Sequence, residues 1–372
     1  MSHRTTPPFR ADHVGSLLRP PSLLRAREDF AASRISAGEL RKVEDDAVRA
    51  AVKMQEEVGL EAATDGEFRR GSWHMDFIYS LGGFTASEDH MQVQFRNDAG
   101  IVEFTPSIAR ADEKVRLEET IFGDDFTTLK GMTTTAAAKQ TIPSPSMVHY
   151  RGGRTVVNPD VYPDMEEFWA DVTAAWAEEV RRLGALGCTY LQLDDTCFAY
   201  LNDPQQRANL AARGEDAEHL HLQYIRHFNE AVRSRPEGMT VTTHTCRGNF
   251  RSSWVAEGSY DFVAESLFSE LDVDAFFMEF DDARSGGFEP LRFVPEGKLV
   301  VLGLVTTKRG ELESKDEIKR RIAQASAFVP LDQLCLSPQC GFSSTVDGNA
   351  LTFDQQKEKL RLVVETAAEI WG

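Results

Sequence analysis

Short apolar segments alternate with amphipathic segments along nearly the whole chain. The apolar segments do not alternate cleanly between polar and apolar residues, which is the pattern of parallel strands covered on both faces. Such segments predict strands at His13–Leu17, Ala62–Gly66, Ala138–Pro143, Tyr190–Asp194, Met239–Thr245, Ala275–Phe280, Lys298–Val305 and Gln333–Ser337.

The segments between these predicted strands carry apolar residues at steps of three or four, which is the period of a helix. The clearest stripes run over Leu40–Val58, Met165–Leu183 and Leu360–Trp371. Alternating strands and helices predict an α/β protein, and eight parallel strands are the number that closes a (β/α)8 TIM barrel. A doubly wound open sheet is the main alternative. No G-x-G-x-x-G or P-loop follows any strand, which argues against its nucleotide-binding form.

One stretch departs from this rhythm. Between residues 84 and 135 the pattern changes to short alternating runs, such as Lys114–Glu118, with Gly100 as a turn residue. This favours a β-rich insertion of hairpins after the second strand. A single α/β barrel takes about 250 residues and often carries insertions. We therefore interpret residues 1–372 as one catalytic domain with residues 84–135 inserted into it.

Charge and composition narrow the class of partner. The chain has 41 Lys+Arg against 59 Asp+Glu, a formal net charge of −18. Nucleic acid and anionic membranes would be repelled by most of this surface. No apolar run approaches the roughly 18 residues that cross a bilayer, and no signal core is visible. The five cysteines lack a disulfide-scaffold spacing. We expect a cytoplasmic protein with small-molecule ligands. Whether it forms a homo-oligomer is left open.

Candidate metal ligands stand at the ends of predicted strands, where a TIM barrel builds its active site. The fifth strand ends in His244-Thr245-Cys246, the sixth carries Glu279 among apolar residues, and Cys340 follows the eighth. An imidazole, two thiolates and a carboxylate suit tetrahedral zinc. Buried Cys and His often only fill space, but a Glu in an apolar strand is costly to bury without a partner. The four residues together therefore favour a metal site.

Other strand ends carry polar groups of a different kind. Val14–Ser16 offers backbone N–H donors and a hydroxyl that suit a carboxylate, whereas Thr64–Glu67 and Leu191–Asp195 offer carboxylates that suit an ammonium group. Each alone is typical of an ordinary strand-end turn. Together they predict a pocket for a zwitterionic, amino-acid-like ligand beside a metal.

These motifs resemble, in the same order, the catalytic C-terminal barrel of cobalamin-independent methionine synthase. The similarity runs from about Arg10 to the C-terminus. It comprises the V-G-S turn, the D-G-E segment, the L-Q-L-D strand, the H-x-C pair, the strand Glu and the P-x-C-G loop. Each motif is short. However, chance rarely gives all six of them in the same order at corresponding strand ends.

The resemblance implies a role for each position. A Zn²⁺ ion is expected on the ligands His244, Cys246, Glu279 and Cys340. The interval from Cys246 to Glu279 is longer than in the synthase, so Glu265 and Glu270 stay as weaker candidates for the carboxylate ligand. Glu67 and Asp194, the expected catalytic carboxylates, match those that hold the amino group of homocysteine, and Gly15 with Ser16 match the turn that binds its carboxylate.

The chemistry expected from this resemblance is methyl transfer to a thiol. A thiol with a pKa near 8.5 is mostly protonated at neutral pH, and binding to zinc releases that proton. The resulting thiolate, most simply that of homocysteine, would attack a methyl donor such as 5-methyltetrahydrofolate and give methionine. The partners are then a small thiol and a methyl donor, with a folate as one candidate.

The chain also departs from the family pattern. After the seventh strand it reads Leu304–Lys308, without the family's acid histidine, and His13 and His74 are the candidate replacements. Three alternatives therefore stay open. One is zinc-thiolate chemistry with another electrophile, such as an epoxide that accepts coenzyme M or a methyl-corrinoid. The others are a metal-free lyase resembling uroporphyrinogen decarboxylase and a binding protein with structural zinc.

Overall fold

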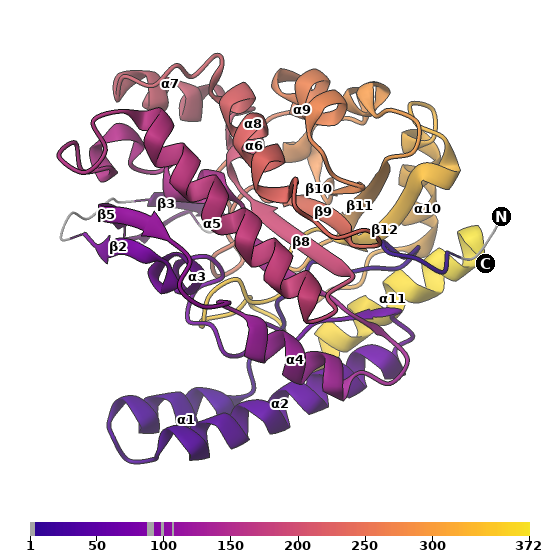
Figure 1. Cartoon of the computed structure of the whole chain (residues 1–372). Coiled ribbons are helices and arrows are strands. Elements are labelled where there is room, and N and C mark those ends of the chain that lie inside the picture. Colours follow the sequence, from indigo (N-terminus) through magenta and orange to yellow (C-terminus); the bar gives the residue numbers. More distant parts are fainter. Residues whose placement is uncertain (1–3, 88–92, 98–99, 106–107) are drawn as a thin grey trace.

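The computed structural model describes residues 4–87, 93–97, 100–105 and 108–372. Its centre is a six-stranded parallel sheet in the order β12-β11-β10-β9-β8-β7, so each strand lies beside its predecessor in the chain (Figure 1). The strands are almost entirely buried, as expected for a sheet covered by helices. They are β7 (Gln140–Pro143), β8 (Tyr190–Asp195), β9 (Thr240–Thr245), β10 (Ala275–Glu279), β11 (Leu299–Val305) and β12 (Leu334–Pro338).

Two further parallel pairings accompany this sheet. β1 (Ala62–Ala63) and β6 (Ala137–Ala138) form a separate two-stranded sheet, and β6 directly precedes β7 in the chain. At the β12 edge, Ala11 forms a parallel bridge with Leu336. The α/β class is therefore confirmed, and every predicted strand except the first coincides with an observed one or nearly so. Closure into an eight-stranded barrel stays a prediction.

The first predicted strand, His13–Leu17, is wrong. This segment is irregular, and the Leu17 N–H donates to the Gly66 carbonyl oxygen over 3.1 Å rather than joining a ladder. Gly15 has a φ of +151°, and a Cβ there would lie only 2.9 Å from Thr141 Cγ2. The segment is thus a tightly packed turn whose apolar residues are buried without forming a strand.

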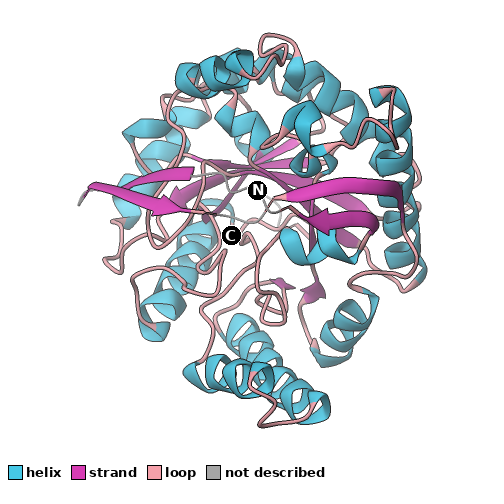
Figure 2. Ribbon diagram, turned by 90° about the vertical axis from the view of Figure 1, so that its left-hand side faces the viewer, coloured by secondary structure: helices cyan, strands magenta, loops and turns pink. Residues whose placement is uncertain are grey.

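Helices surround the central strands (Figure 2). The long helices follow the predicted apolar stripes, and in the described part of the chain none is both long and apolar enough to cross a membrane. The helices are α1 (Pro21–Ala31), α2 (Ala37–Glu57), α3 (Met75–Ser80), α4 (Gly123–Met132), α5 (Met165–Ala185), α6 (Cys197–Tyr200), α7 (Pro204–Ala212), α8 (Leu220–Val232), α9 (Ala264–Glu270), α10 (Lys315–Ala325) and α11 (Phe353–Trp371).

Strands also occupy much of the stretch 84–135, of which residues 88–92, 98–99 and 106–107 lie outside the described residues. β2 (Gly82–Ala86) pairs antiparallel with β5 (Ala109–Arg116), and β3 (Val93–Asn97) pairs antiparallel with β4 (Gly100–Phe104). The β structure ends with β5, and α4 follows it. The division of the chain into one domain with an inserted segment stays a prediction.

The β3–β4 hairpin lies against the loop that follows β9. The backbone of Arg96 in β3 exchanges two hydrogen bonds with Trp254, of 2.7 and 2.8 Å. Phe95 and Phe104 pack on Phe250, with ring centroids 5.4 and 4.5 Å away. The hairpin is thereby fixed beside the loop after β9, which also carries Cys246.

Candidate active site

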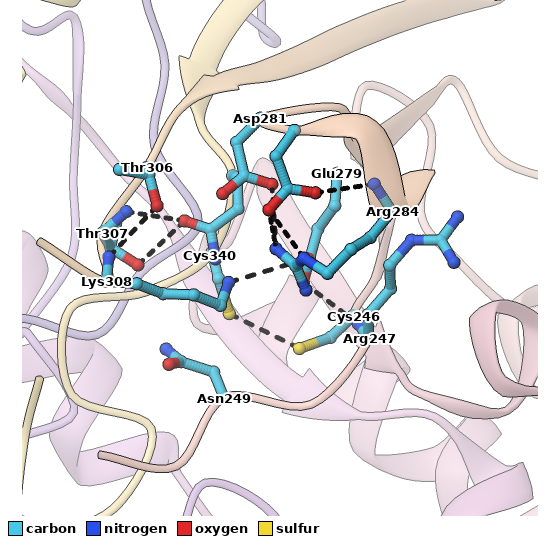
Figure 3. Close-up of polar contacts among 12 residues, drawn as sticks. Cys246, Arg247, Asn249, Glu279, Asp281, Arg284, Thr306, Thr307, Lys308 and Cys340 are labelled. Carbon is cyan, nitrogen blue, oxygen red and sulfur yellow. Dashed lines mark hydrogen bonds and ion pairs between the residues drawn. The ribbon is translucent and has the colours of Figure 1, made fainter. Parts of the chain in front are cut away.

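Four possible metal ligands converge where β9, β10 and β12 end. One ligand atom from each of His244, Cys246, Glu279 and Cys340 lies within 4.8 Å of the others, and all four residues are buried. The Sγ atoms of Cys246 and Cys340 are 3.5 Å apart (Figure 3). In the parallel register of β9 and β10, Phe277 pairs with His244, so that Glu279 and Cys246, each two residues further along, lie at the same level. The structure therefore brings together the whole set predicted from the sequence.

Glu279 offers a carboxylate oxygen to this cluster. Its Oε1 accepts a hydrogen bond of 3.0 Å from the backbone N–H of Arg247, whereas its buried Oε2 has no hydrogen-bond partner. The Lys308 ammonium lies 3.9 Å from that Oε2 (Figure 3). Burial raises the pKa of Glu279, and Lys308 opposes this shift. The alternative ligands Glu265 and Glu270 are exposed on α9, outside the cluster.

His244 lies between a carboxylate and a thiol. Its Nδ1 is 3.4 Å from Asp194 Oδ1, and its Nε2 is 3.3 Å from the Gln339 carbonyl oxygen. Burial disfavours the imidazolium, but the hydrogen bonds and charges of Asp194 and Cys340 outweigh it and raise the pKa of His244 to about 10. The hydrogen bond with Cys246 lowers the pKa of Cys340 well below its usual value, which favours the thiolate form that binds metals.

This donor set fits the zinc ion that the resemblance implies. Two soft sulfurs, one imidazole and one carboxylate form a mixed donor set that suits the borderline-soft, tetrahedral Zn²⁺ ion. The unpartnered Oε2 of Glu279 is a buried acceptor that a cation would satisfy. A hard carboxylate beside three softer ligands also suits the exchangeable position of a catalytic zinc site.

The cluster opens into a cavity of about 250 Å³. Three of the possible metal ligands, His244, Cys246 and Cys340, line it together with the predicted substrate-binding residues Ser16, Glu67 and Asp194. Gly15 adjoins them, because a Cβ on it would lie 3.5 Å from Glu67 Oε1. The two groups of residues predicted from separate strand ends therefore meet in one site.

Glu67 has a strained backbone and an incompletely satisfied side chain. Its φ of +60° is uncommon outside glycine. Its Oε1 accepts from Thr141 Oγ1 over 2.9 Å and lies 3.4 Å from Arg70 Nη1, whereas its buried Oε2 has no partner. Burial raises the pKa of Glu67 to about 7, with Arg70 opposing the shift. A ligand N–H can satisfy the free oxygen.

Asp194 is held by a residue of its own strand, and Ser16 is held by a neighbouring loop. Asp194 Oδ1 accepts a hydrogen bond of 2.7 Å from Gln192 Nε2, which orients the carboxylate. The Ser16 carbonyl oxygen accepts from the Phe342 N–H over 2.9 Å, and its Oγ accepts from the Ser343 N–H over 3.3 Å. The turn at Ser16 is thereby tied to the loop that carries the last cysteine of the cluster.

Neither candidate histidine has the properties of a proton donor at neutral pH. His74 lines the cavity, but burial and the charge of Arg151 lower its pKa well below the usual value. Burial and Lys139 lower the pKa of His13 to about 4, and His13 is not among the residues that line the cavity. Both imidazoles are therefore neutral near pH 7.

Several residues in or near the site were not predicted from the sequence. Lys308 follows β11, and the strand-end rule could have singled it out. Arg151, Tyr200 and Asn249 also line the cavity or its rim, but they lie in loops or a short helix without a motif. Only the folded chain brings these residues to the ligand cluster.

Comparisons with known proteins find relatives that match nearly the whole chain. A sequence profile described as the catalytic domain of cobalamin-independent synthase matches residues 9–369. The uncharacterized protein YxjG of Bacillus subtilis is 44% identical, over 99% of this chain and 96% of that protein. The methionine synthase of Pyrococcus abyssi is 25% identical, over 88% of this chain and 84% of that protein.

Solved structures show the same likeness. A Listeria monocytogenes protein, provisionally assigned as a vitamin-B12-independent methionine synthase, aligns with a TM-score of 0.78 and 36% identity, over 99% of this chain and 100% of the other. A B12-independent methionine synthase from Shewanella in complex with selenomethionine aligns with a TM-score of 0.71, over 97% of each chain. Its identity is 20%, so this second likeness concerns the fold alone.

Proposed function

The chain belongs to the cobalamin-independent methionine synthase family, and from this premise we propose that it transfers a methyl group to homocysteine and forms methionine. One observation carries the proposal. The metal-ligand cluster shares a cavity with the buried carboxylates Glu67 and Asp194, which can hold an amino-acid thiol beside the cluster. Relatives named methionine synthase and 5-methyltetrahydropteroyltriglutamate–homocysteine methyltransferase support the reaction class.

Zinc is the proposed metal, held by His244, Cys246, Glu279 and Cys340. When bound, it supplies a Lewis acid that keeps the substrate thiol as thiolate at neutral pH. Glu279, the only oxygen donor of the four, would be the ligand most easily exchanged for a substrate sulfur. Lys308 Nζ, 3.9 Å from Glu279 Oε2, can pair with the carboxylate once it moves away.

The remaining residues orient the substrate. Glu67 and Asp194 receive its ammonium group, and the backbone of Gly15 with the Ser16 hydroxyl receives its carboxylate. Holding both polar groups of the α-carbon would leave the thiol, at the other end of the molecule, directed toward the metal cluster, which converts binding energy into correct geometry for the displacement. Burial raises the pKa of Glu67 to about 7, so its carboxyl is partly charged at neutral pH, and an ammonium group beside it would favour the charged form.

Methionine formation tests the proposal. Zinc-loaded protein is incubated with homocysteine and, separately, with 5-methyltetrahydrofolate or methylcobalamin as methyl donor, and methionine is measured by mass spectrometry. We expect methionine with at least one donor, and none from the Cys340→Ser variant. Absence of methionine with both donors, although zinc is bound, would contradict methyl transfer from these compounds to homocysteine.

A further inference from the structure

The side chain of Arg19 connects two loops of the candidate active site. Its Nη1 donates hydrogen bonds to the carbonyl oxygen and the Oγ of Ser343 and to the carbonyl oxygen of Thr345, over 3.0, 2.8 and 3.0 Å. Its Nη2 donates to the carbonyl oxygens of Glu67 and Arg70, each over 2.9 Å. One guanidinium therefore joins the turn that carries Glu67 to the loop that follows β12.

Arg19 is buried, and all of these acceptors are uncharged. Burial lowers the pKa of Arg19 to about 10, with the charge of Glu67 opposing the shift, so the guanidinium keeps its charge at neutral pH. Burying a charge is costly unless its hydrogen bonds are made. The planar fork of an arginine reaches acceptors on both sides, whereas the compact ammonium of a lysine is a point charge. The contacts of Arg19 thus hold the two loops in one fixed arrangement.

On one side, Arg19 supports a strained turn. The φ of +60° at Glu67 is sparsely populated outside glycine and persists only where neighbouring contacts hold it. Arg19 bonds to the carbonyl oxygen of Glu67 itself, and the N–H of Arg70 donates to the same oxygen over 3.1 Å. Arg70 Nη1 lies 3.4 Å from Glu67 Oε1. Arg19 therefore holds both the backbone from which the Glu67 carboxylate extends and the neighbour that contacts this carboxylate.

On the other side, Arg19 holds the loop that follows Cys340. Its acceptors there, Ser343 and Thr345, flank Ser344, whose Oγ is 4.0 Å from Cys340 Sγ. Ser344 and Thr345 line the catalytic cavity. The guanidinium that supports the strained turn therefore also fixes the cavity wall beside the metal cluster.

We propose that Arg19 is a positioning residue that fixes the place of the Glu67 carboxylate relative to the metal cluster. It is not among the residues that line the catalytic cavity, so it acts through the two loops. The inference rests on the proposed function, because homocysteine is the ligand whose ammonium group and thiol must reach Glu67 and the metal together. Without Arg19 the two loops can shift independently, and an amino acid held at one end presents its thiol less accurately at the other.

Thiol binding tests this role. Zinc-loaded Arg19→Met is titrated calorimetrically with homocysteine and with 4-mercaptobutanoate, which has the thiol and the carboxylate but no amino group. We expect the affinity for homocysteine to fall about tenfold, the loss that follows when one hydrogen bond to a charged group is no longer formed. The affinity for 4-mercaptobutanoate should fall less, because this thiol has no ammonium group for Glu67 to receive.

Arg10→Met is the matched control. Arg10 is buried too, and its Nη1 donates to the carbonyl oxygens of Asp332 and Leu334 over 3.1 and 2.6 Å, at the end of β12 that lies away from Cys340. This variant loses hydrogen bonds of the same kind but should bind both thiols as the unaltered protein does. Arg19→Lys keeps the charge and loses the fork, so it should retain part of the homocysteine affinity.

Backbone hydrogen exchange gives a second readout that needs no thiol. In Arg19→Met, the N–H groups of Arg70 and Phe342 should exchange faster, because the two loops lose their link, whereas Arg10→Met should leave both rates unchanged. Circular dichroism shows whether each variant is folded. If Arg19→Met is not folded, Arg19→Lys serves for the same comparison, with smaller effects expected.

The proposal is overturned if Arg19→Met lowers the affinity for both thiols equally, or if it binds both as Arg10→Met does. It is also overturned if exchange accelerates in neither loop. If neither Arg19 variant folds although Arg10→Met does, Arg19 serves the fold alone, which contradicts the proposal as well. Failure of the proposed function looks different. In that case the unaltered protein forms no methionine, while Arg19→Met still accelerates exchange in both loops and leaves the central sheet unchanged.

Discussion

Asp194 Oδ1 lies 3.4 Å from Nδ1 of His244, so a carboxylate proposed to bind the substrate also contacts a proposed metal ligand. Gln192 Nε2 donates a hydrogen bond of 2.7 Å to the same oxygen of Asp194. Carboxylates in this position orient a ligating imidazole and tune the metal. In the proposed complex, this single side chain would therefore set the position of the substrate's amino group relative to the metal cluster.

Asp194→Asn should weaken the binding of homocysteine and leave about one zinc per chain. A hydrogen bond to a charged group contributes about 1.5–3 kcal/mol, so we expect a loss of about tenfold to a hundredfold in affinity. The control ligand is 4-mercaptobutanoate, which lacks the amino group and should bind both proteins equally. Calorimetric titration gives both affinities. An equal loss for the two thiols would remove the amino-group role of Asp194.

The affinity for homocysteine should rise with pH as Glu67 ionises. Its pKa, raised by burial to about 7, means that the carboxyl is largely neutral at about pH 6 and largely charged at about pH 8. Both homocysteine and 4-mercaptobutanoate lose a thiol proton on binding zinc, so that contribution cancels between them. The remaining difference in pH dependence reports Glu67, and Glu67→Gln should abolish it. Parallel pH profiles for the two thiols in the unaltered protein would contradict the assignment.

The same carboxyl should make folding stability fall as pH rises. Its pKa is about 7 in the folded chain against the model-compound value of 4.5, so the folded state binds more protons between these values. Stability contributed by the protonated form is therefore lost as pH increases through that window, by about 3 kcal/mol in total. Urea unfolding at several pH values should show a shallower decline for Glu67→Gln. A steeper decline in that variant would be incompatible with this sign.

Cys340→Ser should lose zinc and activity while the fold persists. The hydrophobic core is formed by the sheet and its helices and does not depend on the metal cluster. Cys188→Ser is the matched control, since Cys188 is buried near the start of β8 and lies outside the cluster. Metal analysis and circular dichroism measure the two properties. Full zinc occupancy in Cys340→Ser would show that the ligand assignment is wrong.

Phe250→Ala should loosen the β3–β4 hairpin. Phe250 is buried and stacks on Phe95 and Phe104, so its truncation should cost about 3 kcal/mol or more. Backbone hydrogen exchange in β3 and β4 should accelerate more than in the central sheet. The control is Phe328→Ala, at a partly exposed residue after α10. It should leave the stability and the hydrogen exchange of the hairpin unchanged. Unaltered exchange in the hairpin would mean that other contacts hold it.

The sequence predicted the strands that are wholly buried, because continuous apolar runs such as Leu299–Val305 leave few other solutions. It failed at the first strand, where Gly15 and side-chain contacts favour a buried turn over a ladder. α4 was also missed within a stretch of alternating pattern. Only two large apolar side chains of this helix, Phe126 and Leu129, are buried, and two are too few to form a recognisable helical stripe.

The proposed metal ligands could be predicted because parallel strands end at one edge, so residues far apart in the chain meet there. Cys246 and Cys340, 94 residues apart, are the clearest example. Lys308 also stands just after a strand, but its place 3.9 Å from Glu279 Oε2 is seen only in the folded chain. Arg151 lies in a loop without a motif, so nothing in the sequence singled it out.

Zinc-edge X-ray absorption, recorded with and without homocysteine on zinc-loaded protein, tests the central claim most directly. We expect about one zinc per chain with two sulfur ligands, from Cys246 and Cys340, and a gain of one sulfur with loss of one oxygen when homocysteine binds. That exchange would identify the acceptor thiol and Glu279 as the ligand that yields. A zinc shell that stays the same in saturating homocysteine, or a protein that takes up no zinc, would contradict the account.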